Sequence, residues 1–200
     1  MKTNYLKFLI FSLVLMILHI RPCLSQNNPY NIKHRIGLGY DSYMNADMSL
    51  WSGSIQYVLN PEDRWSWHYS VGFGATDNRK FYGHFPLGAF IGIYFLANSD
   101  GGANELLTTL AILSFIAPEG VSYNIKLNEK TKVSPYINFN SIEFYNNEKD
   151  EERIMPSFGV GTRVSYLVNP NFGISFGLGT KIVAAEGWGI QTGICVYYQY

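Results

Sequence analysis

The sequence predicts an all-β fold, an antiparallel transmembrane β-barrel. Three observations predict it: bulky apolar residues alternate with small polar ones along most of the chain, turn residues separate the alternating segments, and aromatic residues are abundant, with 15 Tyr and 13 Phe in 200 residues. A strand that crosses a bilayer presents one face to lipid and the other to a lumen, so its side chains alternate over about ten positions. Beyond residue 25, no apolar stretch reaches the length of a transmembrane helix, about 20 residues. A membrane-embedded form of this chain must therefore cross as strands.

The first 25 residues are predicted to be a cleaved export signal. Lys2 and Lys7 precede an apolar run at 8–18, and Arg21, Pro22 and the small residue Ser25 follow it, which is the order of an n-region, an h-region and a cleavage site. The run is about a dozen residues long, too short to span a bilayer as a helix. We therefore assign residues 1–25 to a signal peptide and residues 26–200 to one barrel domain.

Composition excludes several classes of function. Lys and Arg number 15, as do Asp and Glu, so the formal net charge is zero and no nucleic-acid partner is expected. Cys195 is the only cysteine left after cleavage, which rules out an intramolecular disulfide and a cysteine-based metal cluster. Cys23 lacks the small preceding residues of a lipoprotein site. No metal-ligand spacing or phosphate-binding glycine loop occurs, so no cofactor is expected.

The first strands are predicted at residues 32–40, 51–59 and 65–75. In the third, apolar and aromatic side chains occupy every second position, and the positions between them carry only Ser, His or Gly. The two earlier segments show the same pattern, with Lys, Arg, Gly, Ser and Gln on the polar face. A fourth strand is predicted at 87–95. Small side chains suit a crowded lumen and large apolar ones suit lipid, whereas a soluble barrel such as a lipocalin has its apolar face inside.

Five further strands are predicted, at 121–127, 132–145, 158–168, 172–182 and 188–200. The segment at 132–145 alternates at first and then shifts phase at Ile142 and Phe144. A β-bulge would account for this slip. Trp65, Trp67 and Trp188 lie on apolar faces and are interpreted as an interfacial aromatic girdle, with a carbohydrate-binding platform as the alternative.

Turn signals separate the segments. Compact turns are predicted at 60–63, 128–130 and 169–171, and looser connections at 77–83 and 146–153. Short turns on one side and longer loops on the other are typical of a transmembrane barrel with its turns in the periplasm.

Residues 105–117 do not alternate and end at a proline, Pro118. A short buried helix is the local interpretation, and a tenth strand buried on both faces is the alternative. Because single-chain bacterial barrels have even strand numbers, we expect eight to ten strands and prefer ten.

The last ten residues are similar to the assembly signal at the end of outer-membrane barrels, a polar residue and a glycine followed by alternating hydrophobic residues that end in an aromatic. The positions that match are Gln191, Gly193, Val196, Tyr198 and Tyr200. With the export signal, the chain resembles the small, porin-family-like outer-membrane β-barrels of Bacteroidetes-type bacteria. The resemblance implies a location in outer-membrane lipid and insertion by the barrel assembly machinery. It implies no substrate.

Two histidines are the candidates for chemistry. His68 shares its predicted lumen face with Ser66 and Ser70, and His84 lies beside the connection that contains Asp77. Lipid-modifying outer-membrane barrels use His with Ser or Asp, but a hydrogen-bonding role is the simpler interpretation. We expect a non-enzymatic barrel with a structural or narrow-pore role, with a soluble ligand-binding barrel or a lipid-modifying barrel enzyme as the alternatives.

Alternation also places a surplus of basic residues in the lumen: Lys33, Arg35, Lys126, Arg163 and Lys181. Unpaired charge in a confined space is costly, so these side chains should meet carboxylates such as Glu143, face water or attract small anions. Because barrels of this size leave little room inside, we expect internal ion pairs that plug the lumen, with a narrow anion-preferring channel as the alternative.

Overall fold

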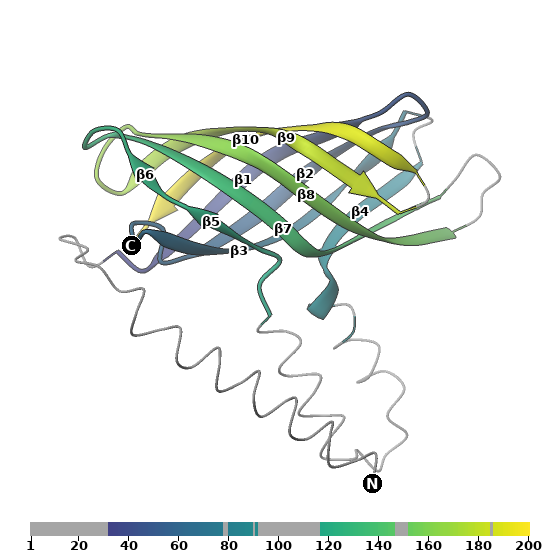
Figure 1. Ribbon diagram of the computed structural model, residues 1–200, viewed down its shortest axis with the longest axis horizontal. Coiled ribbons are helices and arrows are strands. Elements are labelled where there is room, and N and C mark those ends of the chain that lie inside the picture. Colours follow the sequence, from purple (N-terminus) through teal and green to yellow (C-terminus); the bar gives the residue numbers. More distant parts are fainter. Residues whose placement is uncertain (1–31, 78–79, 90, 92–116, 147–151, 185) are drawn as a thin grey trace, which may run out of the picture.

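The chain forms a closed antiparallel β-barrel, which confirms the predicted fold class (Figure 1). The computed structural model describes residues 32–77, 80–89, 91, 117–146, 152–184 and 186–200. The predicted signal peptide at 1–25 lies outside them. The strands are β1 His34–Met44, β2 Ser49–Leu59, β3 Trp65–Thr76, β4 Phe81–Pro86, β5 Gly120–Tyr123, β6 Ile125–Lys126, β7 Thr131–Asn146, β8 Glu152–Leu167, β9 Phe172–Val183 and β10 Gly187–Gln199.

Ten strands fill eight positions around the barrel. β1 pairs with β2 on one side and with β10 on the other, and β7 to β10 pair in sequence order. Between β3 and β7, one position is shared by two short strands that follow each other along the wall. β4 pairs with Gly72–Ala75 of β3, and β5 pairs with Trp65–His68. The two-residue strand β6 extends this position along β7.

The chain therefore leaves the wall halfway along one position and returns to it. β4 ends at Pro86, which has no N–H to donate to a ladder, and β5 begins at Gly120. The predicted strand at 87–95 is wrong where the structure describes it, because residues 87–89 are helical and the strand lies earlier, at Phe81–Pro86. Of the segment 105–117, only Ala117 falls inside the described residues.

The two faces of the wall divide as the alternation predicts. Large apolar side chains point outward and are exposed, for example Leu38 at 70% and Ile55 at 56%, whereas the inward Ser52, Ser54 and Ser66 are buried. This is the reverse of a soluble barrel, whose apolar side chains fill its interior. Within the described ranges, no helix has the length and apolar character needed to cross a bilayer.

The predicted bulge is confirmed in β7, where the register with β8 shifts between Asn138 and Ser141. Phe139 and Asn140 lie in this interval, and both of their backbone N–H groups donate to the carbonyl oxygen of Glu119, each at 3.0 Å. Glu119 immediately precedes β5. The bulge therefore lies at the break between β4 and β5 and supplies the hydrogen bonds that hold the returning chain in the wall.

Both ends of the barrel have short connections. One end, the turn end, carries the connections at 60–64, 127–130 and 168–171 together with the start of β1 and the final residue, Tyr200. Asn60 there has a φ of 55°, in the left-handed region that Asn tolerates. At the other, the loop end, the connections at 45–48, 77–80, 147–151 and 184–186 are no longer than those of the turn end, so the expected long loops are wrong. The long connection of this chain is instead the one between β4 and β5, residues 87–119.

Candidate functional site: the polar lumen

The lumen receives three of the five predicted basic residues. Arg35 and Lys181 are buried inside the barrel, and Arg163 is half-buried there. Lys126 lies exposed at the rim of the turn end. Lys33 is also exposed and does not lie in the lumen as predicted, because it precedes β1 at the rim of the barrel.

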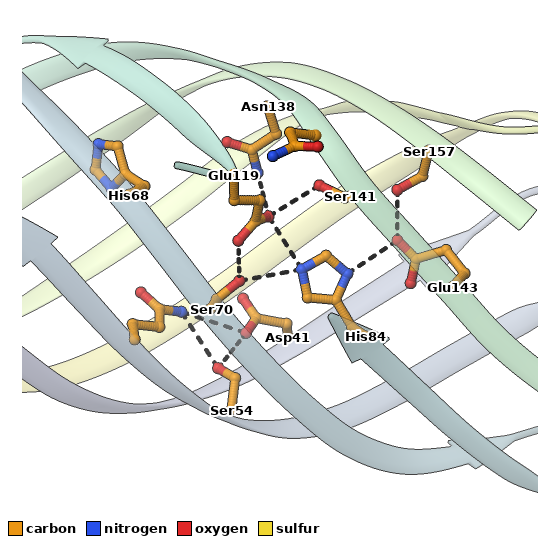
Figure 2. A network of polar contacts seen from close by, with 12 residues as sticks. Asp41, Ser54, His68, Ser70, His84, Glu119, Asn138, Ser141, Glu143 and Ser157 are labelled. Carbon is orange, nitrogen blue, oxygen red and sulfur yellow. Dashed lines mark hydrogen bonds and ion pairs between the residues drawn. The ribbon is translucent and has the colours of Figure 1, made fainter. Parts of the chain in front are cut away.

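Glu143 of β7 belongs to a network of polar contacts inside the barrel (Figure 2). Its carboxylate has no solvent exposure and forms an ion pair with Lys181 of β9. It also accepts hydrogen bonds from the Tyr82 hydroxyl, from Nδ1 of His84 at 2.9 Å and from the Ser157 hydroxyl at 2.6 Å. These partners come from β4, β8 and β9, so the network joins four strands across the inside of the wall.

His84 links Glu143 to a second buried carboxylate. Its Nε2 lies 3.0 Å from Oε1 of Glu119, and the same carboxylate accepts from Asn138 at 3.1 Å and Ser141 at 3.2 Å. A ring that donates from both nitrogens to carboxylates is an imidazolium, which fits a position between Glu119 and Glu143. The side chain of Glu119 thereby joins both sides of the break in the wall to β7 (Figure 2).

Ser70, His84 and Glu143 lie in the order of a nucleophile, a base and an orienting carboxylate. The Ser70 hydroxyl is 3.0 Å from Nε2 of His84, and Nδ1 of His84 faces Glu143. The Ser70 hydroxyl, however, donates to Glu119, and Nε2 of His84 faces the same carboxylate. His84 consequently has no free lone pair with which to accept the Ser70 proton, and this arrangement does not activate a nucleophile.

His68 has a different environment. Nη1 of Arg163 lies 3.2 Å from Nδ1 of His68, and Nε2 lies 2.7 Å from the Ser122 hydroxyl. Because a guanidinium can only donate, Nδ1 accepts and the ring is neutral, with its proton on Nε2. The Arg163 guanidinium also lies 5.5 Å from the ring centre of Tyr136. These three side chains form a layer across the middle of the lumen.

Glu62 organises the lumen at the turn end. Its carboxylate lies 3.3 Å from Lys132, 3.1 Å from Lys126 and 4.0 Å from Arg35. Burial alone raises the pKa of Glu62, but the ammonium groups of Lys132 and Lys126 outweigh it and hold the pKa below its ordinary value. Arg35 also donates to Gln199 at 3.3 Å and lies 3.9 Å from the ring centre of Tyr197. We call Arg35, Glu62, Lys132, Tyr197 and Gln199 the polar plug.

The loop end is closed by a cluster of inward apolar and aromatic side chains, which we call the aromatic stopper: Tyr43, Leu50, Tyr82, Tyr145 and Val183. Met48 and Met155 pack against it. Hydrogen bonds fix its rings, because the Tyr145 hydroxyl donates to Glu186 and the Tyr43 hydroxyl donates to the carbonyl oxygen of Gly187 at 3.0 Å.

Two cavities remain between these closures. The larger, about 50 Å³, is lined by polar side chains that include Asp41, Gln56, Glu119 and Arg163. That volume holds about three waters. The smaller, about 10 Å³, lies toward the turn end. His68, Tyr136 and Arg163 line both cavities and lie between them.

Charges inside the barrel are nearly balanced. Four basic side chains, Arg35, Lys132, Arg163 and Lys181, share the lumen with four carboxylates, Asp41, Glu62, Glu119 and Glu143. With the His84 imidazolium the cations exceed these carboxylates by one, so the surplus of basic charge is smaller than the sequence predicts. Asp41 could have been found, since it continues the inward alternation of Arg35, Gly37 and Gly39. Within the described ranges, no group of His, Cys, Asp and Glu residues is arranged to hold a metal ion.

No family model matches this sequence, and no curated protein matches it. Among solved structures, the N-terminal β-barrel domain of Pseudomonas aeruginosa OprF aligns with a TM-score of 0.51 and 10% identity, over 85% of this chain and all of that one. A major outer membrane protein of Thermus thermophilus aligns with a TM-score of 0.50 and 12% identity, again over 85% of this chain and all of that one. The fold is that of an outer-membrane β-barrel. At these identities the likeness concerns the fold alone.

Proposed function

We propose that this protein is an integral β-barrel of a bacterial outer membrane with a closed lumen and a structural, non-enzymatic role. The apolar outer face supports the membrane location, and the carboxy-terminal pattern supports kinship with the small barrels of Bacteroidetes-type bacteria. The observation that carries the closed state is the pair of closures, the polar plug at the turn end and the aromatic stopper at the loop end.

Opening a pore through this lumen would have a high energetic cost. Parting the polar plug would leave the buried Glu62, Lys132 and Arg35 without their partners, and breaking a buried ion pair costs about 3–5 kcal/mol. A narrow anion channel is the weaker candidate, because Asp41, Glu119 and Glu143 offset the basic side chains along the path.

Two experiments test the proposal. Heat-modifiable migration in detergent and recovery in the outer-membrane fraction are expected, and recovery as a detergent-free periplasmic monomer would refute the membrane location. In planar bilayers the purified barrel should give no channel conductance. An anion-selective conductance that falls in Arg163→Ala or Lys181→Ala would establish the pore instead.

The order of Ser70, His84 and Glu143 suggests a second candidate, a lipid-modifying hydrolase, which the hydrogen bonds to Glu119 disfavour. We expect no release of fatty acid from phospholipid in detergent micelles by the folded barrel, because Glu119 takes the hydrogen bonds that a catalytic serine and base would need. Hydrolysis that disappears in both Ser70→Ala and His84→Ala would establish the enzyme.

A further inference from the structure

The turn end carries a ring of exposed cations, which we call the basic rim: Lys33, Arg64, Lys126 and Lys130. We propose that the basic rim binds the phosphate groups of anionic phospholipids in the membrane leaflet that meets the turn end. This inference rests on the proposed membrane location and adds a specific lipid partner to it.

The two ends of the barrel differ in charge. At the turn end, four of the exposed charged side chains are basic and one, Glu129, is acidic, and the half-buried carboxylates Glu62 and Asp63 lie at the same end. At the loop end, the exposed charged side chains among the described residues are Asp47, Asp77 and Glu152, all of them acidic. The exposed cations of the turn end therefore attract an anionic surface, whereas the described residues of the loop end expose acidic side chains.

Among the described residues, three of the four rim cations form no ion pair, although Lys33 lies near Asp63. Lys126 is paired with Glu62, but within the described residues Lys33, Arg64 and Lys130 form no ion pair. Lys130 lies at the tip of the hairpin between β6 and β7, Arg64 lies beside β3 and Lys33 lies beside the last residue of the chain, so the three flank different parts of the barrel rim.

An aromatic belt on the outer face marks where this rim meets the membrane. The ring of Tyr200 lies 6.0 Å from that of Tyr198 and 5.5 Å from that of His34, and Tyr57 lies 6.0 Å from His34 and 5.7 Å from Tyr69. Nδ1 of His34 is also 2.7 Å from the Tyr57 hydroxyl. Such amphipathic rings settle at the headgroup level of a bilayer. The belt and the rim belong to the same end, so the cations lie at the level of lipid phosphates.

The basic side chains of the rim are suited to binding phosphate groups. Lys and Arg donate several charge-assisted hydrogen bonds to phosphate oxygens, and each basic side chain near an anionic membrane surface strengthens association by about fivefold. A zwitterionic lipid carries the same phosphate, but its own ammonium group cancels the attraction. The rim should therefore favour phosphatidylglycerol over phosphatidylcholine.

The test compares spin-labelled phosphatidylglycerol with spin-labelled phosphatidylcholine in bilayers that contain the full barrel, and measures the relative association constant from the motionally restricted lipid signal. The wild-type barrel should prefer phosphatidylglycerol severalfold, and added salt should weaken that preference because exposed charges are screened. The triple variant Lys33→Gln, Arg64→Gln and Lys130→Gln should lower the ratio toward one. The matched control, Asp47→Asn with Glu152→Gln at the loop end, should leave the ratio high.

Equal association of the two lipids with the wild-type barrel would overturn the inference, as would a preference that the triple variant retains. Stronger association with added lipopolysaccharide than with phosphatidylglycerol would also overturn it, since the rim would then select a different leaflet. Heat-modified migration is measured for each variant beforehand. A barrel that fails to insert contradicts the proposed function, whereas a barrel that inserts without a lipid preference contradicts only this inference.

Discussion

Lys181 and Glu143 form an ion pair inside the barrel although their strands, β9 and β7, are not neighbours. β8 lies between them, and the residue of β8 opposite Lys181 is Gly159, which has no side chain to block the reach. Both partners are almost fully buried, and Glu143 accepts three further hydrogen bonds. The pair therefore links β7 to β9 across β8 on the inside of the wall.

Replacing Glu143 should destabilise the barrel strongly. Glu143→Gln leaves the buried ammonium of Lys181 without its counter-charge, and such a loss costs about 3–5 kcal/mol. Unfolding by urea in detergent micelles measures the change. Glu152→Gln, an exposed residue at the start of β8, is the control and should change the free energy of unfolding by less than about 0.5 kcal/mol. Equal stability of the two variants would contradict the role of the pair, and adding Lys181→Gln to Glu143→Gln should recover part of the loss.

The polar plug should weaken in acid. The pKa of Glu62 is lower in the folded barrel than in the unfolded chain, so its ionised form stabilises the fold. That contribution is complete above the unfolded pKa and is lost as the pH falls through the folded pKa. Glu62→Gln should accordingly lower the free energy of unfolding near neutral pH and flatten its decline in acid. An unfolding series over pH in detergent measures this, and parallel curves for the two proteins would refute it.

Alternation along single strands predicted the two faces of the barrel because a lipid-facing strand repeats every two residues. It also located the bulge, since the phase change at Ile142 is visible in the sequence. The same argument missed Lys132, which is buried in the lumen at the start of β7. It failed for Lys33 because that residue precedes β1 and is exposed at the rim of the turn end.

The break in the wall could not be predicted from local pattern. β4 and β5 are short strands. They occupy one strand position of the barrel because both pair with β3 on one side and with β7 on the other. Glu119 and His84 meet only because those pairings bring them together across the break. Nothing in the sequence around Glu119 or His84 indicates that the two side chains meet. The sequence also gives no indication of the hydrogen bonds that exclude Ser70 as a nucleophile.

The aromatic stopper should control access to the lumen. Cys195 lines the larger cavity and is buried, and in a Cys23→Ser background it is the only cysteine. A charged maleimide should label it slowly in the folded barrel. Tyr43→Ala with Tyr145→Ala removes two rings of the stopper, so labelling should accelerate by an order of magnitude or more. Tyr166→Ala, on the outer face, is the control and should keep the slow rate. Fast labelling without any substitution would show that the lumen is open.

Deleting Tyr200 should reduce insertion for two separable reasons. The first reason is that Tyr200 ends the predicted assembly signal. The second is that it closes the barrel against β1. Its carbonyl oxygen accepts hydrogen bonds from the N–H groups of Lys33 and His34, and its own N–H donates to the His34 carbonyl oxygen at 2.9 Å. Cells should therefore carry less heat-modifiable protein, whereas Tyr200→Phe, which keeps the ring and the backbone, should insert normally. Refolding in detergent without the assembly machinery separates the causes: a deletion that refolds fully there but inserts poorly in cells loses the signal, and one that fails in both loses the closure. Normal insertion in cells would show that the final residue is only an ordinary strand end.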